Sequence, residues 1–431
     1  MNSAINANEW NRRRFIEGTA KALLGVGALG MTNRAGAAAG AGLGLPPRIG
    51  AAKHIIYLYM DGGMTHLDTF DTKPKHKYQG PTKTIDTNVD HIKLSGHLPS
   101  LAAQADKLTI INSMTSTAGA HTQGNYFMHT SYDQRATIRH PGLGAWALKY
   151  KGRMNPNLPG SVFVGGNSRI NGGGGFFEPE FEPLAINNPN SGLRNSKLRG
   201  MDQEQLDEDL ELASQFDTEF QERYDVKQVR AYTQMYDDAV RIMQSKDLQA
   251  FDLKAEDSAT RARYGNDPFG QGCLLARRLI EHDVRAVEVS YLGWDMHNSV
   301  FQLAPDKCAI LDRAMGALLT DLERVGKLDD TVVVLTTEFG RTPRINENGG
   351  RDHHPQAFST VLAGGGFKGG TVYGKTDEGG ENVIDNPVEI PDFNATIAYA
   401  MGLPLDQVLY SPSKRPFTVA HKGEPVLDLF S

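Results

Sequence analysis

The sequence predicts an α/β fold in which a mostly parallel, doubly wound sheet carries helices on both faces. Short, nearly continuous apolar runs at 54–60, 108–114 and 331–338 are typical of strands buried on both faces. Segments with helical periodicity separate these runs, as in repeated βαβ units. The 431 residues are enough for one large domain of this kind or for two ordinary ones.

Strands and helices are expected to alternate from residue 53 onward. The run at 331–338 is the clearest strand because it is rich in β-branched residues. The segment 307–325 is the clearest amphipathic helix, with leucines and a methionine on one face. The other expected strands are 161–166, 285–292 and 358–363, and the other expected helices are 98–105, 122–130, 141–150, 273–282 and one that starts at 394–401.

Two segments are expected to interrupt the alternation. Residues 167–200 are rich in Gly, Asn and Pro and predict a long loop. Charged residues with helical spacing at 202–248 predict a helical excursion that extends over about 202–265. We find no internal repeat and no convincing linker, so 50–431 is expected to form a single domain.

Composition excludes several classes of function. The chain is 39% apolar and 22% charged with a net charge of −6, which gives no reason to expect nucleic acid or a polybasic membrane contact. Cys273 and Cys308 are the only cysteines, so a disulfide framework and a thiolate metal site are excluded. They are expected to be free or buried thiols, with one isolated disulfide as the alternative.

Residues 1–40 have the pattern of an export signal. Arginines at 12–14 are followed by Phe15 and Ile16, then by a weakly apolar stretch at 20–31 and small residues at 35–39. This pattern predicts a twin-arginine signal peptide, hence a partner in the twin-arginine export machinery and a location in the bacterial periplasm or outside the cell. A basic amphipathic first helix is the alternative. No other apolar run reaches eighteen residues, so no stable membrane span is expected.

Carboxylate and imidazole side chains follow predicted strands or lie in the loops between them. Open α/β sheets gather such residues at the carboxyl ends of their strands. Oxygen and nitrogen ligands of this kind bind Zn²⁺ or a similar cation, which supplies Lewis acidity to a hydrolase. The candidate metal ligands are Asp61, His121, Asp295, His297, Glu338, His353 and His354.

The local sequence around each candidate leaves alternatives open. Asp61 comes directly after the strand 54–60, where a helix-capping carboxylate is the other explanation. Asp295 and His297 are two residues apart, so in extended backbone they share one face. Glu338 ends a buried strand, which is costly unless its charge is paired or metal-bound. Arg341 is either its partner or a bidentate contact for an anionic substrate.

His353 and His354 are adjacent, and adjacent side chains in extended backbone point to opposite sides. We therefore expect one of the two imidazoles to be a metal ligand. The other is expected to support the ligands from outside or to contact substrate.

With these residues in place, the chain resembles the alkaline phosphatase and sulfatase superfamily. It most closely resembles an exported, sulfatase-like bacterial family, domain of unknown function 1501. The resemblance rests on the motifs GGMTHLDTFDTKP, GWDMH, TEFGRTP and DHHP, which occur in order within residues 53–401. It implies an alkaline-phosphatase-like fold with two metal ions that flank a hydroxyl nucleophile.

The resemblance also implies roles for individual residues. Asp61 and Glu338 would bind one ion; Asp295, His297 and either His353 or His354 would bind the other. The sequence departs from the superfamily at Glu338-Phe339, where an Asp-His pair is usual, and it lacks the sulfatase cysteine signature C-x-P-x-R. Formylglycine chemistry is therefore not expected.

The position of the superfamily nucleophile corresponds here to His121, with Thr122 beside it. His121 would replace the missing imidazole ligand. Thr122 is then the candidate nucleophile, or a metal-bound hydroxide attacks directly.

The sequence thus predicts an exported metal-dependent hydrolase of phosphate or sulfate esters. One or two divalent ions are expected, Zn²⁺ first, with Mn²⁺, Mg²⁺ or Ca²⁺ as alternatives. The substrate would be a small anionic ester, with Arg341 and Arg351 neutralising its oxygens. The alternative is a non-catalytic binding protein that retains the fold and a degenerate metal site. The sequence does not define the substrate or the oligomeric state.

Overall fold

The computed structural model describes residues 52–165, 173–193, 241–243 and 245–431. The predicted signal at 1–40 and residues 202–240 of the predicted helical excursion lie outside the described residues. In the rest of that segment the chain forms two 3₁₀ turns, Lys246–Phe251 and Leu253–Ala255, and the helix α7, Ser258–Tyr264.

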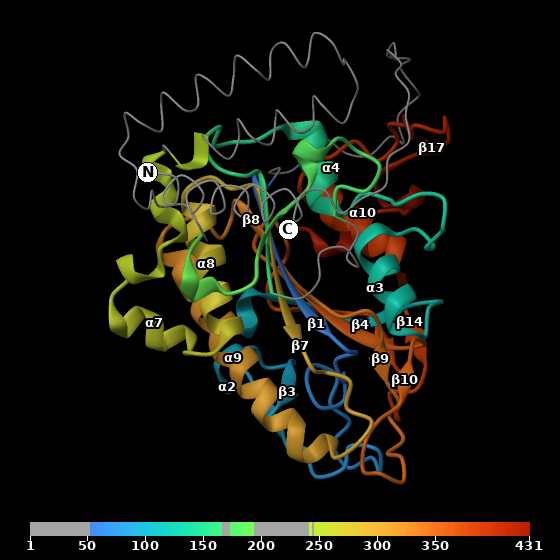
Figure 1. Ribbon diagram of the computed structural model, residues 1–431. Helices are drawn as coiled ribbons and strands as arrows, with labels where there is room; N and C mark the ends of the chain where they lie inside the picture. Colours follow the sequence, from blue (N-terminus) through green and yellow to red (C-terminus); the bar gives the residue numbers. More distant parts are fainter. Residues whose placement is uncertain (1–51, 166–172, 194–240, 244) are drawn as a thin grey trace, which may run out of the picture.

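A central sheet organises the described part of the chain (Figure 1). Its strands are β1 His54–Asp61, β4 Leu108–Thr115, β5 Ser161–Val164, β6 Leu184–Ile186, β7 Ala286–Leu292, β8 Thr331–Thr336, β11 Phe358–Ala363, β12 Thr371–Tyr373 and β15 Val388–Glu389. The order across the sheet is β12-β4-β11-β8-β1-β7-β5-β6, and β15 also pairs with β4. The strands predicted at 54–60, 108–114, 285–292 and 358–363 are confirmed to within one residue at each end.

The sheet is mostly parallel, which confirms the predicted fold class. β1 pairs in parallel with both β7 and β8, and β5 pairs in parallel with β6 and β7. β11 is the exception, because it runs antiparallel to β4 and to β8. The short strand β6 lies inside the segment predicted to be a loop, and its three residues are too few to give a periodic signal.

Helices cover both faces of the sheet, as predicted (Figure 1). One face is covered by α2 Pro99–Ala102, α8 Pro268–Glu281 and α9 Val300–Arg324, and the other by α3 His121–Thr130, α4 Leu143–Lys151 and α10 Ile390–Ala400. α9 begins at Val300, seven residues before the predicted start at 307. Pro305 lies within its first two turns, and a proline near the start of a helix is tolerated better than one in its interior. α10 likewise begins four residues early.

The two hydrophobic cores meet at the central strand. Successive side chains of a strand point to opposite faces, so β1 contributes Ile56 and Leu58 to one core and Ile55 and Tyr57 to the other. All four side chains are buried. Burial on both faces explains why the strand reads as an unbroken apolar run rather than as an alternating one.

Short two-stranded ribbons surround the sheet. The ribbon that matters for the site is β9 Gly340–Arg341 with β10 His353–His354, which pair antiparallel. The others are β2 Thr84–Asp86 with β3 Lys93–Ser95, β13 Lys375–Thr376 with β14 Val383–Asp385, and β16 Leu409–Tyr410 with β17 Pro416–Phe417. Within the described ranges, no helix combines the length and the apolar composition needed to cross a lipid bilayer.

Candidate metal site

Three imidazole nitrogens converge on one carboxylate oxygen at the carboxyl edge of the sheet. Oδ1 of Asp295 lies 3.3 Å from Nε2 of His121, 3.1 Å from Nε2 of His297 and 3.4 Å from Nε2 of His353. The last two nitrogens are 3.0 Å apart. Zinc–nitrogen bonds of about 2.0–2.1 Å in a tetrahedron separate neighbouring ligand atoms by about 3.3 Å. The distances to Oδ1 of Asp295 are of this size, and His121, Asp295 and His353 together present ligand atoms that all lie within 4.8 Å of one another.

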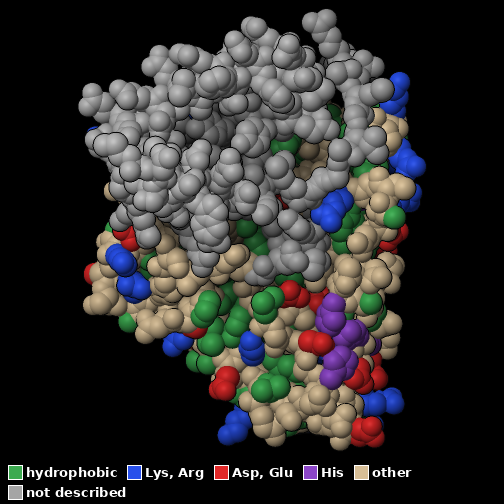
Figure 2. All heavy atoms as spheres, in the orientation of Figure 1, with side chains coloured by type: hydrophobic (Ala, Val, Ile, Leu, Met, Phe, Trp, Pro, Cys, Tyr) green, Lys and Arg blue, Asp and Glu red, His purple; other side chains and the backbone are tan. Residues whose placement is uncertain are grey.

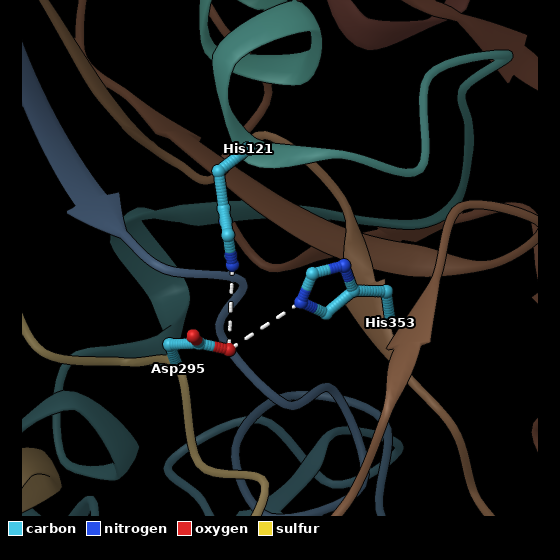
Figure 3. Close-up of side chains that lie close together, drawn as sticks. All are labelled: His121, Asp295 and His353. Atoms are coloured by element: carbon cyan, nitrogen blue, oxygen red, sulfur yellow. Dashed lines mark hydrogen bonds and ion pairs between the residues drawn. The ribbon is translucent and has the colours of Figure 1, made fainter.

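Separate segments of the chain supply these side chains, as Figure 3 shows for three of them. His121 is the first residue of α3, and His353 opens β10. Asp295 and His297 lie in the loop that follows β7. The sequence prediction that these residues meet at one edge of the sheet agrees with this placement.

Each imidazole is held from behind by an oxygen atom. A carbonyl or carboxylate oxygen can only accept, so Nδ1 carries a hydrogen in all three rings, and Nε2 is the nitrogen that each ring turns toward the cluster. The bonds run from His121 to Oε1 of Glu338 (2.6 Å), from His297 to Oδ1 of Asp352 (2.8 Å) and from His353 to the carbonyl of Gly119 (2.8 Å).

This arrangement fits a bound cation. Nε2 of His297 and Nε2 of His353 lie 3.0 Å apart, a distance at which two unprotonated nitrogens repel unless a cation or a proton lies between them. Nε2 of His121 is buried and has no hydrogen-bond partner among the described residues. A metal ion accepts electron density from all of these atoms at once, which removes both penalties.

Arg341 fixes the charge and the position of Asp295. It is 1% exposed, and its guanidinium donates to Oδ1 of Asp295, to the carbonyls of Gly62 and Gly63, and to the carbonyl of Arg351. Burial acts to raise the pKa of Asp295, but the hydrogen bond and charge of Arg341 outweigh it and lower that pKa to about 2. The carboxylate therefore stays anionic, as a metal ligand must.

The surroundings shift the pKa values of two of the imidazoles in opposite directions. The hydrogen bond to Glu338 raises the pKa of His121. Burial, followed by the positive charge of Arg341, lowers the pKa of His353.

Glu338 supports the cluster from outside, which differs from the direct ligand expected from the sequence. Its side chain is fully buried, and Oε1 accepts from His121 and from the backbone N–H of Gly62 at 2.9 Å. Oε2 accepts from the hydroxyls of Tyr59 at 3.1 Å and Thr337 at 2.9 Å. Both hydroxyls also have a closer acceptor, Asn125 for Tyr59 and the carbonyl of Met60 for Thr337, so they share their single hydrogens. The bond to Nδ1 of His121 makes Glu338 a group that orients this imidazole from outside the cluster.

Asp61 lies beside the cluster. It ends β1, and its Oδ1 accepts from Nδ2 of Asn125 at 3.4 Å. Burial, followed by the charge of Glu338, raises the pKa of the Asp61 carboxyl. In the described ranges the grouping of potential metal ligands contains His121, Asp295 and His353, without Asp61 or His297. The structure therefore groups ligands for one ion, whereas the superfamily resemblance implied two.

Two other expected site residues lie away from the cluster centre. Thr122 is exposed, and within the described ranges its hydroxyl bonds to none of the cluster side chains. His354 faces the other side of β10, where its Nε2 donates to the carbonyl of Glu381 at 2.7 Å. His353 is thus the imidazole that joins the cluster.

The two arginines expected to contact substrate are buried. Arg351 is 0% exposed and forms an ion pair of 2.8 Å with Asp68, which is also 0% exposed. It also donates to the carbonyl of Tyr78 at 2.8 Å. Arg341 is committed to Asp295 and to backbone carbonyls, as described above. In this structure both guanidinium groups hold the loops of the site in place, and neither faces solvent.

Sequence reasoning missed the residues that connect these groups. The side chain of Asn125 contacts both Asp61 and Tyr59. Asn125 lies four residues after His121 on α3, a spacing that places both on one helix face and could have revealed it. Gly62 is required at its turn, because its φ is +119° and an added Cβ would lie 2.5 Å from the backbone nitrogen of Asp295.

The outer carboxylate gives a first testable expectation. Glu338→Gln should weaken metal binding about 10- to 100-fold, since loss of such outer hydrogen bonds to a ligating histidine has effects of that size. Titration of metal-free protein with Zn²⁺ in a competing chelator measures the change. Glu347→Gln is the matched control, because Glu347 is exposed and has no described contact with the site. Equal affinity in the two variants would contradict the outer role of Glu338.

The fold and the cluster together define a mixed α/β protein with a candidate metal centre at the carboxyl edge of its sheet. The profile of the family described as "Protein of unknown function (DUF1501)" matches residues 52–430. The chain belongs to that family. A search of the curated proteins found no match.

Solved structures show distant similarity. The lipoteichoic acid synthase LtaP from Listeria monocytogenes is 8% identical, with 83% of this chain and 74% of that chain covered and a TM-score of 0.39. The PsFucS1 sulfatase from Pseudoalteromonas sp. is 10% identical, with 87% and 73% covered and a TM-score of 0.38. The alkaline phosphatase from the Antarctic bacterium TAB5 is 11% identical, with 82% and 99% covered and a TM-score of 0.34. Similarity at this distance does not define an activity.

Proposed function

We propose that this protein is an exported, metal-dependent hydrolase of phosphate or sulfate esters. One observation carries the proposal: three imidazole Nε2 atoms converge on Oδ1 of Asp295, and each ring is fixed from behind by an oxygen. This combination of ligand type, spacing and outer support is typical of zinc sites. Zn²⁺ is the proposed ion, with Mn²⁺, Mg²⁺ or Ca²⁺ as alternatives.

The exposure of the cluster favours a reactive site over a purely structural one. The side chains of Asp295 and His297 are 46% and 40% exposed, so a solute can reach them. Figure 2 shows histidine and acidic side chains together on the molecular surface. Structural zinc sites are closed to solvent, whereas catalytic sites keep a position for water or substrate.

Each residue of the site has its own role in the proposed reaction. His121, His297, His353 and Asp295 would hold the ion, which supplies Lewis acidity toward an ester oxygen when it is bound. Arg341 keeps Asp295 ionised and in place. Thr122, which adjoins His121 on the exposed side of α3, is the proposed protein nucleophile, with water as the alternative.

Localisation and partners are part of the same proposal. Residues 1–40 would direct the folded protein through the twin-arginine machinery to the periplasm or beyond. The substrate would be a small anionic ester.

Metal analysis combined with a substrate screen tests the function. Full-length protein, purified without chelator, is expected to contain about one zinc per chain by elemental analysis, because the described ligands group around one position. It should hydrolyse at least one of 4-nitrophenyl phosphate, bis(4-nitrophenyl) phosphate and 4-nitrophenyl sulfate. Chelation should abolish the activity and Zn²⁺ should restore it. Protein that holds no metal under any loading condition would disprove the proposal.

The same screen separates hydrolysis from binding alone. A non-catalytic metal-binding protein is the second candidate, and the presence of one ligand group where the superfamily resemblance implies two favours it. Stoichiometric metal without turnover of any ester supports that candidate. Loss of activity in Thr122→Ala with metal retained assigns the nucleophile, whereas unchanged activity assigns that role to water.

A further inference from the structure

The hairpin formed by β13 and β14 contacts two segments of the candidate metal site. Its tip, residues 377–382, accepts two hydrogen bonds from histidine rings. Nε2 of His66 donates to the carbonyl of Gly380 at 2.8 Å, and Nε2 of His354 donates to the carbonyl of Glu381 at 2.7 Å. These histidines belong to the motifs GGMTHLDTFDTKP and DHHP, but neither is part of the metal cluster. Metal binding therefore does not explain their placement.

The two histidines come from different sides of the cluster. His354 follows His353 in β10, and Figure 1 shows β14 beside β9 and β10. His66 lies in the loop after β1, and two carbonyls of this loop accept hydrogen bonds from Arg341, which in turn holds Asp295. One hairpin therefore connects the segment that carries His353 with the segment that seats the partner of Asp295.

The hairpin tip has a shape fixed by its own residues. Oδ1 of Asp377 accepts from the backbone N–H of Gly379 at 3.1 Å and of Glu381 at 2.8 Å. Oδ2 of Asp377 accepts from the backbone and side-chain amides of Asn382 at 3.0 and 2.9 Å. The tip therefore presents its two carbonyls to the histidines from a fixed position.

His66 has one hydrogen to donate, and it is committed to the hairpin. The residue is 1% exposed, and burial lowers its pKa to about 4, so the ring is neutral. A carbonyl oxygen can only accept, so the ring hydrogen lies on Nε2. Nδ1 is buried and has no hydrogen-bond partner among the described residues, which fits a nitrogen that carries only a lone pair.

β10 has little support of its own. It contains only two residues, and its backbone pairs with Gly340 and Arg341 of β9. His353 and His354 point to opposite sides of this short strand. The bond from His354 to the hairpin therefore holds β10 on one side, while His353 projects toward the cluster on the other. A strand that lost this bond would present the His353 ring less accurately.

We propose that the hairpin tip positions the candidate metal site, with His66 and His354 as the positioning residues that connect it to the segments on either side. The inference deepens the proposed function and rests on it, because its measurable effect is the affinity of the site for a metal ion. Neither histidine is expected to contact the ion or the substrate.

Replacement of His354 tests the bond next to the cluster. His354→Leu should weaken Zn²⁺ binding about 3- to 10-fold, the effect of losing one uncharged hydrogen bond. His354→Gln should restore an affinity close to that of the wild type, because the glutamine amide also carries an N–H donor. Titration of metal-free, full-length protein with Zn²⁺ in a competing chelator measures the affinities. His91→Leu is the matched control, because His91 is exposed and has no described contact with the site.

The absorption spectrum of Co²⁺-loaded protein separates positioning from general stability. The spectrum depends on the geometry of the ligands around the ion. It should therefore differ between the wild type and His354→Leu, and it should agree between the wild type and His354→Gln. Circular dichroism melting confirms that each variant is folded.

Gly380→Ala tests the His66 side of the hairpin. Gly380 is buried with a φ of +74°, and an added Cβ would lie 2.6 Å from Cδ1 of Leu67 and 3.2 Å from Nε2 of His66. The tip should move, and the affinity for Zn²⁺ should fall by a similar factor. Gly326→Ala is the control, since Gly326 has a φ of +67° but an added Cβ there would meet no atom within 4 Å.

The outcomes separate this inference from the proposed hydrolase. A Zn²⁺ affinity equal to that of the wild type in folded His354→Leu or Gly380→Ala would overturn the positioning role and leave the hydrolase intact. So would a loss in His354→Leu without recovery in His354→Gln, because the packing of the ring and not its hydrogen bond would then matter. Wild-type protein that binds no metal would overturn both.

Discussion

Replacement of Asp295 by alanine is expected to abolish metal binding and any ester hydrolysis together. Asp295 Oδ1 is the atom on which the three imidazole nitrogens converge. Removing it deletes the anionic ligand and leaves the buried Arg341 without its carboxylate partner. The uncompensated positive charge next to the imidazoles then opposes a cation. Elemental analysis and the ester screen on the same preparation measure both losses.

A matched aspartate keeps this result interpretable. Asp90→Ala removes an exposed carboxylate with no described contact to the cluster, so its metal content and activity should equal those of the wild type. The thermal unfolding midpoint separates loss of the site from loss of the fold. If folded Asp295→Ala protein retains a full complement of metal, the cluster described here is not the binding site.

The second large effect is expected at Arg351. Arg351→Met should destabilise the protein by about 3–5 kcal/mol, because removal of one partner from a fully buried ion pair leaves the other charge uncompensated. The charge left behind is Asp68, which is itself fully buried and accepts hydrogen bonds from Thr65 and Thr82. Urea unfolding followed by circular dichroism gives the free energy of unfolding.

An exposed ion pair provides the comparison. Lys93 and Asp86 are 2.6 Å apart, but their side chains are 56% and 84% exposed. Lys93→Met should therefore change the free energy of unfolding by no more than about 1 kcal/mol. Similar values for the two methionine variants would show that Asp68 is protonated or hydrated in the folded protein, contrary to the buried pair in the structure.

Much of the fold could be predicted because each strand carries its own signal in the local sequence. β1 and β8 are buried on both faces, so nearly every residue in them is apolar or β-branched, and this makes the two strands recognisable. The convergence of Asp295 with His121 and His353 also followed, because parallel strands bring their carboxyl ends to one edge.

The exceptions depended on long-range pairing. The antiparallel direction of β11 is set by its neighbours β4 and β8, since its own sequence fits either direction. The choice of His353 over His354 depends on the two-residue pairing of β10 with β9, which decides which ring faces the cluster. The partner of Arg341 is Asp295, which is distant in sequence, whereas the local sequence offered only the nearby Glu338 or an anionic substrate.

The proposed metal site takes its side chains from distant parts of the chain, which has a thermodynamic consequence. An unfolded chain holds His121 and His353 more than two hundred residues apart, so only the native state presents a high-affinity site. Occupancy and folding are then linked equilibria. Above saturation, each tenfold rise in free ion concentration should add about 1.4 kcal/mol to the free energy of unfolding. A metal-free protein of moderate stability would therefore unfold less often at a high free zinc concentration. The zinc concentration of its surroundings would then determine how long the folded protein survives.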